Sequence, residues 1–321
     1  MSNINLYQQW GITLDLALEA HELLRGATGQ EIPGVKEDKE NYPYATVTTI
    51  TILSPEGAKI MQKPIGRYIT IEAAELRIPD PESQRQLSDL LNQKLQPLLP
   101  KDDQSNLLLI GLGNWNATPD ALGPRVISQC VITRHLYKYA PEALTPGMRS
   151  VCALTPGVLG ITGIETAEII RGVVEKIQPT AMIVIDALAA KSVDRIGSTI
   201  QIADTGISPG SGVGNQRIGI NQETMGIPVI AIGIPTVVHA AIIIEEAILK
   251  LFQSMKMYEG LHPPIINEII NEVLAPFSGN LTVTPKEIDS MINNLAQLLA
   301  QGINQALHPN VNPSQFNMYL Q

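Results

Sequence analysis

Cysteine and aromatic residues are scarce in this sequence, and their scarcity limits the chemistry and the core that it can build. The 321 residues include only two cysteines, Cys130 and Cys152, and neither lies in a recognisable motif with a histidine. We interpret both as small buried hydrophobic residues rather than as a disulfide or a nucleophile. Aromatic residues make up 4% of the chain, so the core must consist mainly of aliphatic side chains.

Positive charge and long apolar runs are also missing. The 22 lysine and arginine residues are outnumbered by 31 aspartate and glutamate residues, which gives a formal net charge of −9. A nucleic-acid-binding protein needs a basic face, so we expect no direct contact with nucleic acid. The chain lacks a membrane-length apolar run and a basic N-terminal region followed by an apolar core. We therefore expect a cytoplasmic protein without a membrane partner.

Common metal and nucleotide motifs are absent as well. The histidines show no metal-ligand spacing and no H-E-x-x-H motif occurs, so we expect neither a zinc peptidase nor any other metal or cofactor. The glycine-rich loop at 205–216 has no G-x-G-x-x-G pattern that opens a helix, and the GLGN sequence at 111–114 lacks the third glycine. We interpret the glycine-rich loop as backbone that borders a cleft.

The stretch at 106–124, NLLLIGLGNWNATPDALGP, is the most informative part of the chain. Its apolar run at 107–110 predicts a buried strand, and the glycines that follow allow a sharp turn. Thr118 or Asp120 is expected to cap a helix that runs to about Tyr139. Asp120 would then lie at the carboxyl end of a strand, where α/β sheets place their ligand crevices.

A second apolar run, at 181–185, predicts another strand and ends in Asp186. An aspartate at a strand end is usually a cap or a turn residue, so neither Asp120 nor Asp186 is informative alone. Together they would stand at one edge of a parallel sheet. Two carboxylates that share a cleft push their pKa values apart, so that one stays protonated while the other accepts a proton from water. This arrangement predicts a hydrolase of the acid-pair kind.

Helix ends are predicted from capping patterns in the second half of the chain. Thr236 is expected to cap a long helix that follows a strand at 227–234 and contains His239. Two S/T-x-x-E patterns, at 162–165 and 284–287, predict capping boxes. For that reason we interpret Glu165 as a cap rather than as a catalytic residue.

The string at 111–124 resembles the germination protease family, the spore endopeptidases that degrade small acid-soluble spore proteins. The resemblance covers nearly the whole chain except the last forty or so residues. The other segments that carry it are DLALEAHELLRG (15–26), TPGVLGITGIET (155–166), EIIRGVVEKIQP (168–179), IDALAA (185–190), ADTGISPGSGVGN (203–215) and GIPVIAIGIPTVV (226–238).

The fold that we expect is α/β, a three-layer α/β/α arrangement of the phosphorylase/hydrolase-like type with a mostly parallel central sheet. Strands at 45–53 and 63–76 predict an extra β hairpin beside the main sheet. The chain after the last long strand is expected to form a helical elaboration at the C-terminus.

The resemblance implies a zymogen with a propeptide at 1–15 and a single peptidase domain at 16–321. Self-processing would then cut between Asp15 and Leu16, an acidic residue followed by an apolar one, and family substrates are likewise cut after an acidic residue. The resemblance further implies a homotetramer that acts in the forespore or spore core, with small acid-soluble spore proteins as its partners.

The resemblance and the two acids together suggest a mechanism. Asp120 and Asp186 would hold a water molecule between them, the ionised carboxylate accepting its proton while the other polarises the carbonyl or protonates the amine. The sequence leaves open which acid is the base, although a helix amino end near Asp120 would favour its ionised form.

Supporting roles are assigned to four other residues. Backbone N–H groups of the glycine-rich loop, around Gly212, or the side chain of Asn114 would stabilise the oxyanion. Lys191 and Arg195 could recognise an acidic substrate residue, and a solvated surface role is the equal alternative for both.

Two other functions are compatible with the sequence. The first is a hydrogenase-maturation-type peptidase, which a cluster of soft or imidazole ligands near Asp120 would favour. The second is a non-catalytic protein of the same fold that binds an anion, against which two acids facing the site would argue.

Overall fold

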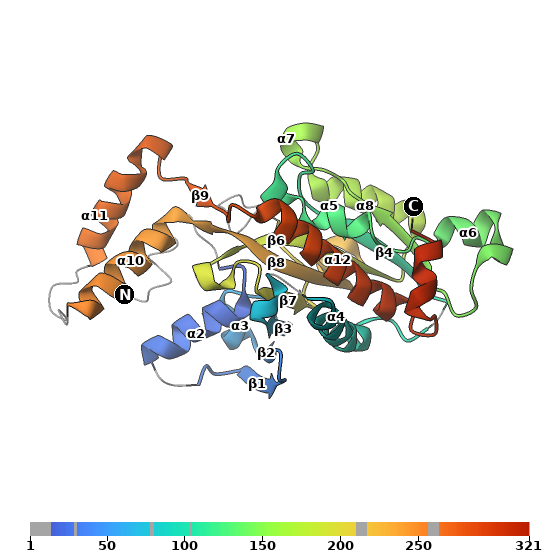
Figure 1. Cartoon of the computed structure of the whole chain (residues 1–321), viewed down its shortest axis with the longest axis horizontal. Coiled ribbons are helices and arrows are strands. Elements are labelled where there is room, and N and C mark those ends of the chain that lie inside the picture. The colour runs from blue at the N-terminus through green and yellow to red at the C-terminus, as the bar shows by residue number, and fades with distance from the viewer. Residues whose placement is uncertain are drawn as a thin grey trace.

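The computed structural model describes residues 14–28, 31–77, 80–102, 104–209, 217–255 and 263–320. Within these ranges the strands form a nine-stranded sheet in the order β1-β2-β3-β7-β8-β6-β4-β5, with β9 paired to β8 (Figure 1). The strands are β1 Val35–Asn41, β2 Thr46–Ile52, β3 Gly66–Glu72, β4 Asn106–Gly111, β5 Ser150–Leu154, β6 Ala181–Ala190, β7 Thr199–Ala203, β8 Val229–His239 and β9 Thr282–Val283.

The sheet has a parallel half and an antiparallel half. Strands β5, β4, β6 and β8 are parallel to one another, whereas β7, β3, β2 and β1 continue the sheet with antiparallel pairs. The α/β class is therefore confirmed, but the sheet is mixed rather than mostly parallel. The expected hairpin is a three-stranded antiparallel unit joined to the main sheet through β7.

Helices cover both faces of this sheet. They are α2 Ala17–Thr28, α3 Pro55–Met61, α4 Pro81–Leu95, α5 Leu122–Ile127, α6 Arg134–Tyr139, α7 Leu159–Thr162, α8 Thr166–Ile177, α9 Gln222–Met225, α10 Ala240–Ser254, α11 Pro263–Leu274 and α12 Ile288–Leu307. Helices α10 and α11 lie beyond the end of the sheet and form an arm (Figure 1).

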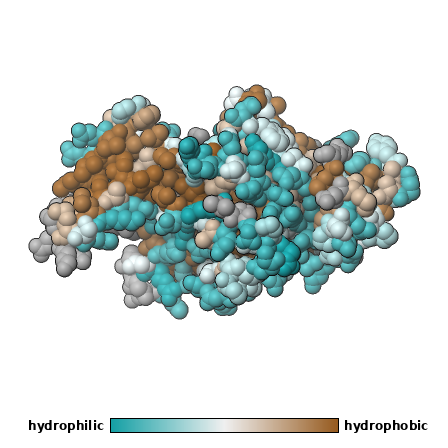
Figure 2. Space-filling model, in the orientation of Figure 1, coloured by the Kyte–Doolittle hydropathy of each residue, from teal (hydrophilic) through white to brown (hydrophobic). Residues whose placement is uncertain are grey.

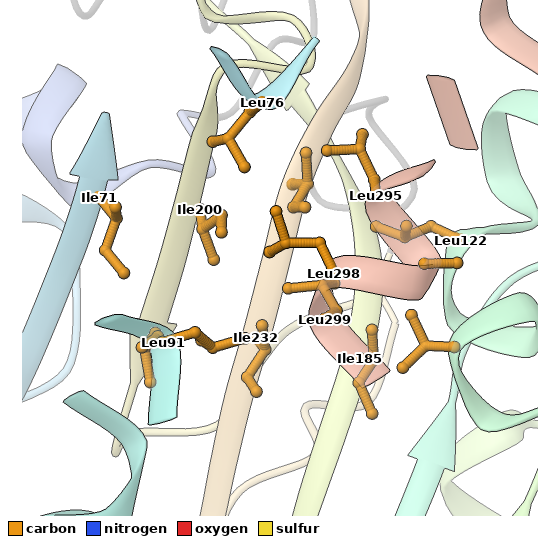
Figure 3. Close-up of a cluster of buried hydrophobic side chains, with 14 of the residues drawn as sticks. Ile71, Leu76, Leu91, Leu122, Ile185, Ile200, Ile232, Leu295, Leu298 and Leu299 are labelled. Atoms are coloured by element: carbon orange, nitrogen blue, oxygen red, sulfur yellow. The ribbon is translucent and has the colours of Figure 1, made fainter. Parts of the chain in front are cut away.

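One face of the sheet is packed by α4, α5 and α12. Helix α12 presents Leu295, Leu298 and Leu299, whose spacing places them on one side of a helix, toward Ile185 and Ile232 of the central strands (Figure 3). These side chains are fully buried. The expected aliphatic core is thus confirmed on this face.

The opposite face of the parallel half is packed by α8. Side chains alternate across a strand, so Leu107 and Leu109 of β4 join the core under α12, while Leu108 and Ile110 join the core under α8. Both faces of β4 are therefore buried. This is the reason that the strand reads as a continuous apolar run in the sequence.

The helix that was expected from Asp120 to Tyr139 is wrong, because the chain forms two short helices there. Helix α5 follows Ala121, which caps it without a side-chain hydrogen bond. After α5 the N–H of Val131 donates to Asn304 Oδ1 of α12 at 2.9 Å instead of to a helical carbonyl. A tertiary acceptor thus takes the place of a helical carbonyl at Val131, four residues beyond the end of α5 at Ile127.

The capping prediction for Thr236 is also wrong. Strand β8 continues through His239, because Val238 and His239 pair with β9. His239 is itself the cap of α10, and its Nδ1 accepts a hydrogen bond from the N–H of Ala241 at 3.2 Å. The strand is longer and the helix starts later than the sequence predicts because β6 pairs with β8 through Val238 and β9, 43 residues downstream of His239 at Thr282, pairs with its last two residues.

Neither predicted capping box forms. Glu165 and Glu287 do occupy the cap positions of α8 and α12, but neither makes a side-chain capping hydrogen bond. The short helix α7 occupies the region of Thr162, and the Thr284 hydroxyl donates to the carbonyl of Thr236 at 2.9 Å.

Both cysteines are free, as predicted. Cys130 is buried and Cys152 is partly buried, and burial raises the pKa of the Cys130 thiol to about 12. In the part of the chain that the structure describes, no helix has both the length and the apolarity of a membrane span.

Candidate active site

Asp120 lies in a single 3-10 turn, Thr118–Asp120, between β4 and α5. The carbonyl of Asp120 accepts a hydrogen bond from the N–H of Asn114 at 3.1 Å. Gly113 has a φ of +114°, and a Cβ at that position would lie 1.9 Å from the Asp120 carbonyl oxygen. Only glycine permits this close approach, so Gly113 fixes the place of Asp120 relative to β4.

Asp186 lies within β6. The sequence had instead predicted that it stands at the end of this strand. Strand β4 stops at the pair Gly111–Ile185, whereas β6 continues along β8 to Ala190. The edge of the sheet is therefore stepped, and Asp186 stands just beyond the end of β4. The Asp186 side chain is 7% exposed and accepts a hydrogen bond from the N–H of Ala187 at 2.9 Å.

The two acids line the same cavity of about 280 Å³, which also includes Asp15, Ala189 and Arg217. Burial raises the pKa of Asp120 to about 6, against the opposing effects of the Asn114 N–H and the Arg217 charge. Burial also raises the pKa of Asp186 well above its usual range, and the charges of Asp120 and Asp15 raise it further. Asp186 is thus the acid that retains its proton more readily, and Asp120 the one that ionises first.

Asp15 is the unexpected occupant of this cavity. Its carboxylate accepts a hydrogen bond from the N–H of Ala189 on β6 at 3.0 Å. The next residue, Leu16, is completely buried. The Asp15 side chain, which precedes the bond at which the family resemblance places the processing cut, therefore lies in the cavity of the acid pair.

The main chain around this bond is held from the other side by two side chains. Lys63 Nζ donates to the carbonyl of Leu14 at 2.8 Å and to that of Asp15 at 3.0 Å. The Gln201 amide donates to the Asp15 carbonyl at 3.2 Å and accepts from the N–H of Ala17 at 2.7 Å. Lys63 and Gln201 line a second cavity, of about 170 Å³, which Asp15 shares.

Of the predicted oxyanion donors, only Asn114 lies among the described residues, and its side chain has a different partner. The Asn114 side chain accepts a hydrogen bond from the N–H of Asn116 at 2.9 Å and does not line the cavity of the acid pair. Its main-chain N–H supports Asp120 instead. Gly212 lies outside the described residues.

Lys191 and Arg195 lie in a different cavity, of about 610 Å³. Arg195 forms ion pairs with Glu22 at 2.8 Å, Glu72 at 3.4 Å and Glu19 at 3.5 Å. The main-chain N–H of Lys191 donates to Glu19 at 2.9 Å. Arg195 is thus already paired with carboxylates and lies in another cavity. Both facts argue against direct contact between Arg195 and a substrate residue at the acid pair.

Sequence reasoning missed Lys63, Gln201 and Arg217. Lys63 belongs to the turn between α3 and β3, and Gln201 is the polar residue of the strand sequence TIQIA. Alternation alone would give Gln201 a solvated face, yet it is 9% exposed. No sequence signal identifies these residues, because the segments that bring them to residue 15 are distant in the chain.

No group of three or more His, Cys, Asp or Glu side chains that could hold a metal ion occurs among the described residues.

The comparisons of this chain with a family profile and with individual proteins point to the same family. The profile of the family described as germination protease matches residues 15–263 and 253–320. The germination protease of Caldanaerobacter subterraneus subsp. tengcongensis is 47% identical over 97% of this chain and 98% of its own length. That of Clostridium tetani is 44% identical over 96% and 99%, and that of Bacillus cytotoxicus 40% identical over 97% and 97%.

Among solved structures, a nickel–iron hydrogenase maturation protease from Thermococcus kodakarensis KOD1 covers 67% of this chain and 98% of its own, with a TM-score of 0.36 and 19% identity. The family resemblance that the motifs predicted is confirmed by the near full-length matches to germination proteases. The chain belongs to the germination protease family of endopeptidases.

Proposed function

We propose that this protein initiates the degradation of small acid-soluble spore proteins during germination, in the interior of the spore, and cuts them after acidic residues. We further propose that it is made as a zymogen that removes residues 1–15 by its own cut between Asp15 and Leu16. Membership of an endopeptidase family argues against the non-catalytic, anion-binding alternative.

The observation that carries this proposal is the position of Asp15. An acidic side chain that precedes an apolar residue already occupies the cavity of Asp120 and Asp186, with its carboxylate on the Ala189 N–H. A substrate segment with the same two residues would place its carboxylate on the same N–H group. The zymogen segment thus presents the chemistry that the enzyme would select in its substrates.

The proposed mechanism assigns different roles to the two acids. Asp120, whose pKa is about 6, is ionised near neutral pH and accepts a proton from the attacking water. Asp186, whose pKa is raised further by burial and by neighbouring charge, holds the proton that is given to the leaving amine. The two groups titrate as a coupled pair, so apparent pKa values will belong to the pair.

Substitution of either acid tests the proposal. Asp120→Asn and Asp186→Asn should each lower the rates of self-processing and of spore-protein cleavage by about a thousandfold or more, on the scale found for essential acid–base groups. The measurement is gel and mass analysis of purified full-length protein, alone and with a small acid-soluble spore protein. The matched control is Asp289→Asn, an exposed aspartate on α12.

Cleavage at the normal rate in either active-site variant would remove that residue from the chemistry. A cut at any bond other than the one between Asp15 and Leu16 would overturn the proposed zymogen boundary.

A homotetramer is the proposed assembly. The arm of α10 and α11 exposes a group of large apolar side chains, and Figure 2 shows this hydrophobic surface over the arm. The residues are Leu249, Leu251, Met255, Ile265, Ile269 and Val273. Exposed apolar patches of this kind commonly mark protein–protein contacts, which supports an assembly through the arm.

A further inference from the structure

We infer that Lys63 and Gln201 form a main-chain clamp on the bond that is cut, in which Lys63 stabilises the oxyanion and Gln201 sets the register of the substrate. The inference rests on the proposed function, because it takes the segment at 14–17 as an occupant of the substrate site. It concerns two residues outside the acid pair, and it assigns to them the role that the sequence gave to Asn114 and Gly212.

The first part of the clamp is the ammonium group of Lys63. The Lys63 side chain is half-buried, and its ammonium donates to two successive carbonyls, those of Leu14 and Asp15. A cation that is partly withdrawn from water needs specific hydrogen-bond acceptors. Both acceptors of Lys63 are carbonyls that precede the cut. Lys63 therefore lies where negative charge would develop on the Asp15 carbonyl oxygen.

The second part is the carboxamide of Gln201. Its two ends reach across the bond, donating to the Asp15 carbonyl before the cut and accepting from the Ala17 N–H after it. Both hydrogen bonds are with main-chain atoms, so they do not depend on the side chains of the substrate. They require a free N–H two residues after the cut, which every residue except proline provides.

The geometry separates attack from stabilisation. The carboxylate of Asp15 points to the Ala189 N–H, in the cavity of the acid pair, while its carbonyl oxygen points to Lys63 and Gln201 in the neighbouring cavity. A water held by the acids would then add to the carbonyl carbon from one face of the peptide plane, while the donors remain on the oxygen. Preorganised donors of this kind stabilise the charge that forms in the transition state.

The reaction balances with these groups alone. The water oxygen bonds to the Asp15 carbonyl carbon as its proton passes to ionised Asp120, and the carbonyl π electrons move onto the oxygen held by Lys63. The intermediate then collapses, the C–N bond breaks, and the proton of Asp186 passes to the nitrogen of Leu16. Products are a carboxylic acid at residue 15 and an amine at residue 16.

The test of Lys63 uses full-length protein and the first-order rate of its own cut. Lys63→Met, which keeps the length of the side chain and removes its charge, should slow the cut by about a hundredfold to a thousandfold, the range for loss of one oxyanion donor. Lys63→Arg should recover part of the rate. Lys59→Met is the matched control, because Lys59 is an exposed lysine of α3.

A purely structural role of Lys63, as an anchor for the prosegment, is separated by a second readout. Protein that has completed its own cut is given a peptide with an acidic–leucine bond, and kcat and KM are measured. The oxyanion role predicts a lower kcat with KM nearly unchanged in Lys63→Met. A normal kcat in this assay would overturn the inference, and Lys63→Gln provides the same comparison if the methionine variant does not fold.

The test of Gln201 is made on the substrate side. Ala17 is the first residue of α2, a position at which proline is compatible with a helix. Ala17→Pro should therefore keep the helix but slow the cut about tenfold through loss of one hydrogen bond. Ala17→Ser, which retains the N–H, should be cut normally, and equal rates for the two variants would overturn the role of Gln201.

Different results would contradict the proposed function and the clamp. Continued cleavage in Asp120→Asn or Asp186→Asn contradicts the proposed function. Normal cleavage in Lys63→Met together with loss of cleavage in the aspartate variants contradicts only the clamp.

Discussion

At the scale of single residues, the site is defined by acidic groups that are withdrawn from water. Asp186 stands in an apolar strand and is 7% exposed. Burial is the first cause of its raised pKa, and the charges of Asp120 and Asp15 add to it. Ionised Asp186 is thus disfavoured in the folded state, so the burial of this carboxyl should reduce stability.

The expected consequence is a pH-dependent gain in stability for Asp186→Asn. Because the folded-state pKa is above the unfolded value of 3.8, the unfolded chain ionises first, and folding stability falls as pH rises from about 4 toward the folded pKa. The asparagine variant escapes this loss. It should therefore be more stable than the unsubstituted protein at pH 7 and no more stable near pH 3, because the loss grows only above the unfolded pKa.

Thermal unfolding at a series of pH values measures this effect, with Asp289→Asn as the exposed control. An equal change in stability at pH 3 and pH 7 would contradict the assignment of Asp186 as a buried, protonated acid.

At the scale of secondary-structure elements, the site depends on how closely α5 approaches the sheet. A Cβ at Gly123 would lie 2.3 Å from the carbonyl oxygen of Leu112 and 2.6 Å from that of Ile185. Both contacts are with main-chain atoms that flank the acids, after β4 and immediately before Asp186. Helix α5 can therefore hold its place beside the site only with glycine at this position.

Gly123→Ala should push α5 away from β4 and β6. We expect a loss of about 1–3 kcal/mol in unfolding free energy, the usual cost of overpacking, and slower self-processing because both acids move. Gly172→Ala, at an exposed position of α8 with nothing within 4 Å of the added Cβ, should instead add about 0.5–1 kcal/mol. Urea unfolding and the rate of the cut measure both variants, and similar effects would contradict the close packing of α5.

At the scale of the whole molecule, the sheet and the arm have different surfaces. The helices on the sheet bury their apolar sides in the core, whereas α11 leaves Ile265, Ile269 and Val273 exposed at intervals of four residues. Side chains with this spacing lie on one side of a helix. The arm thus carries a stripe of exposed apolar side chains along α11.

Ile269→Glu should weaken assembly through this stripe. A buried unpaired carboxylate in a contact is strongly unfavourable, so we expect a lower molar mass by light scattering at micromolar concentration, with the fold retained by circular dichroism. Gln104→Glu adds the same charge at an exposed position outside the arm and should leave the mass unchanged. An unchanged mass in Ile269→Glu would exclude the stripe as the contact.

Much of the parallel half of the sheet follows from local sequence. The runs at 107–110 and 181–185 predict strands because both faces of β4 and β6 are buried there, so these stretches contain only apolar residues. The family motif at 111–124 likewise identifies Asp120 together with the glycine-rich turn that positions it. These features are local, so the order of residues is sufficient to predict them.

The tertiary structure decided the rest. The chain beyond Ile127 leaves the helix and bonds to Asn304 through the N–H of Val131. Strand β8 extends to His239 along β6 and β9. Lys63 and Gln201 meet the segment at 14–17 only when three distant parts of the chain pack together. The sequence by itself determined the two acids and their strands, through patterns within a few residues. The partners of the bond between Asp15 and Leu16 depend on long-range hydrogen bonds, which no local pattern encodes.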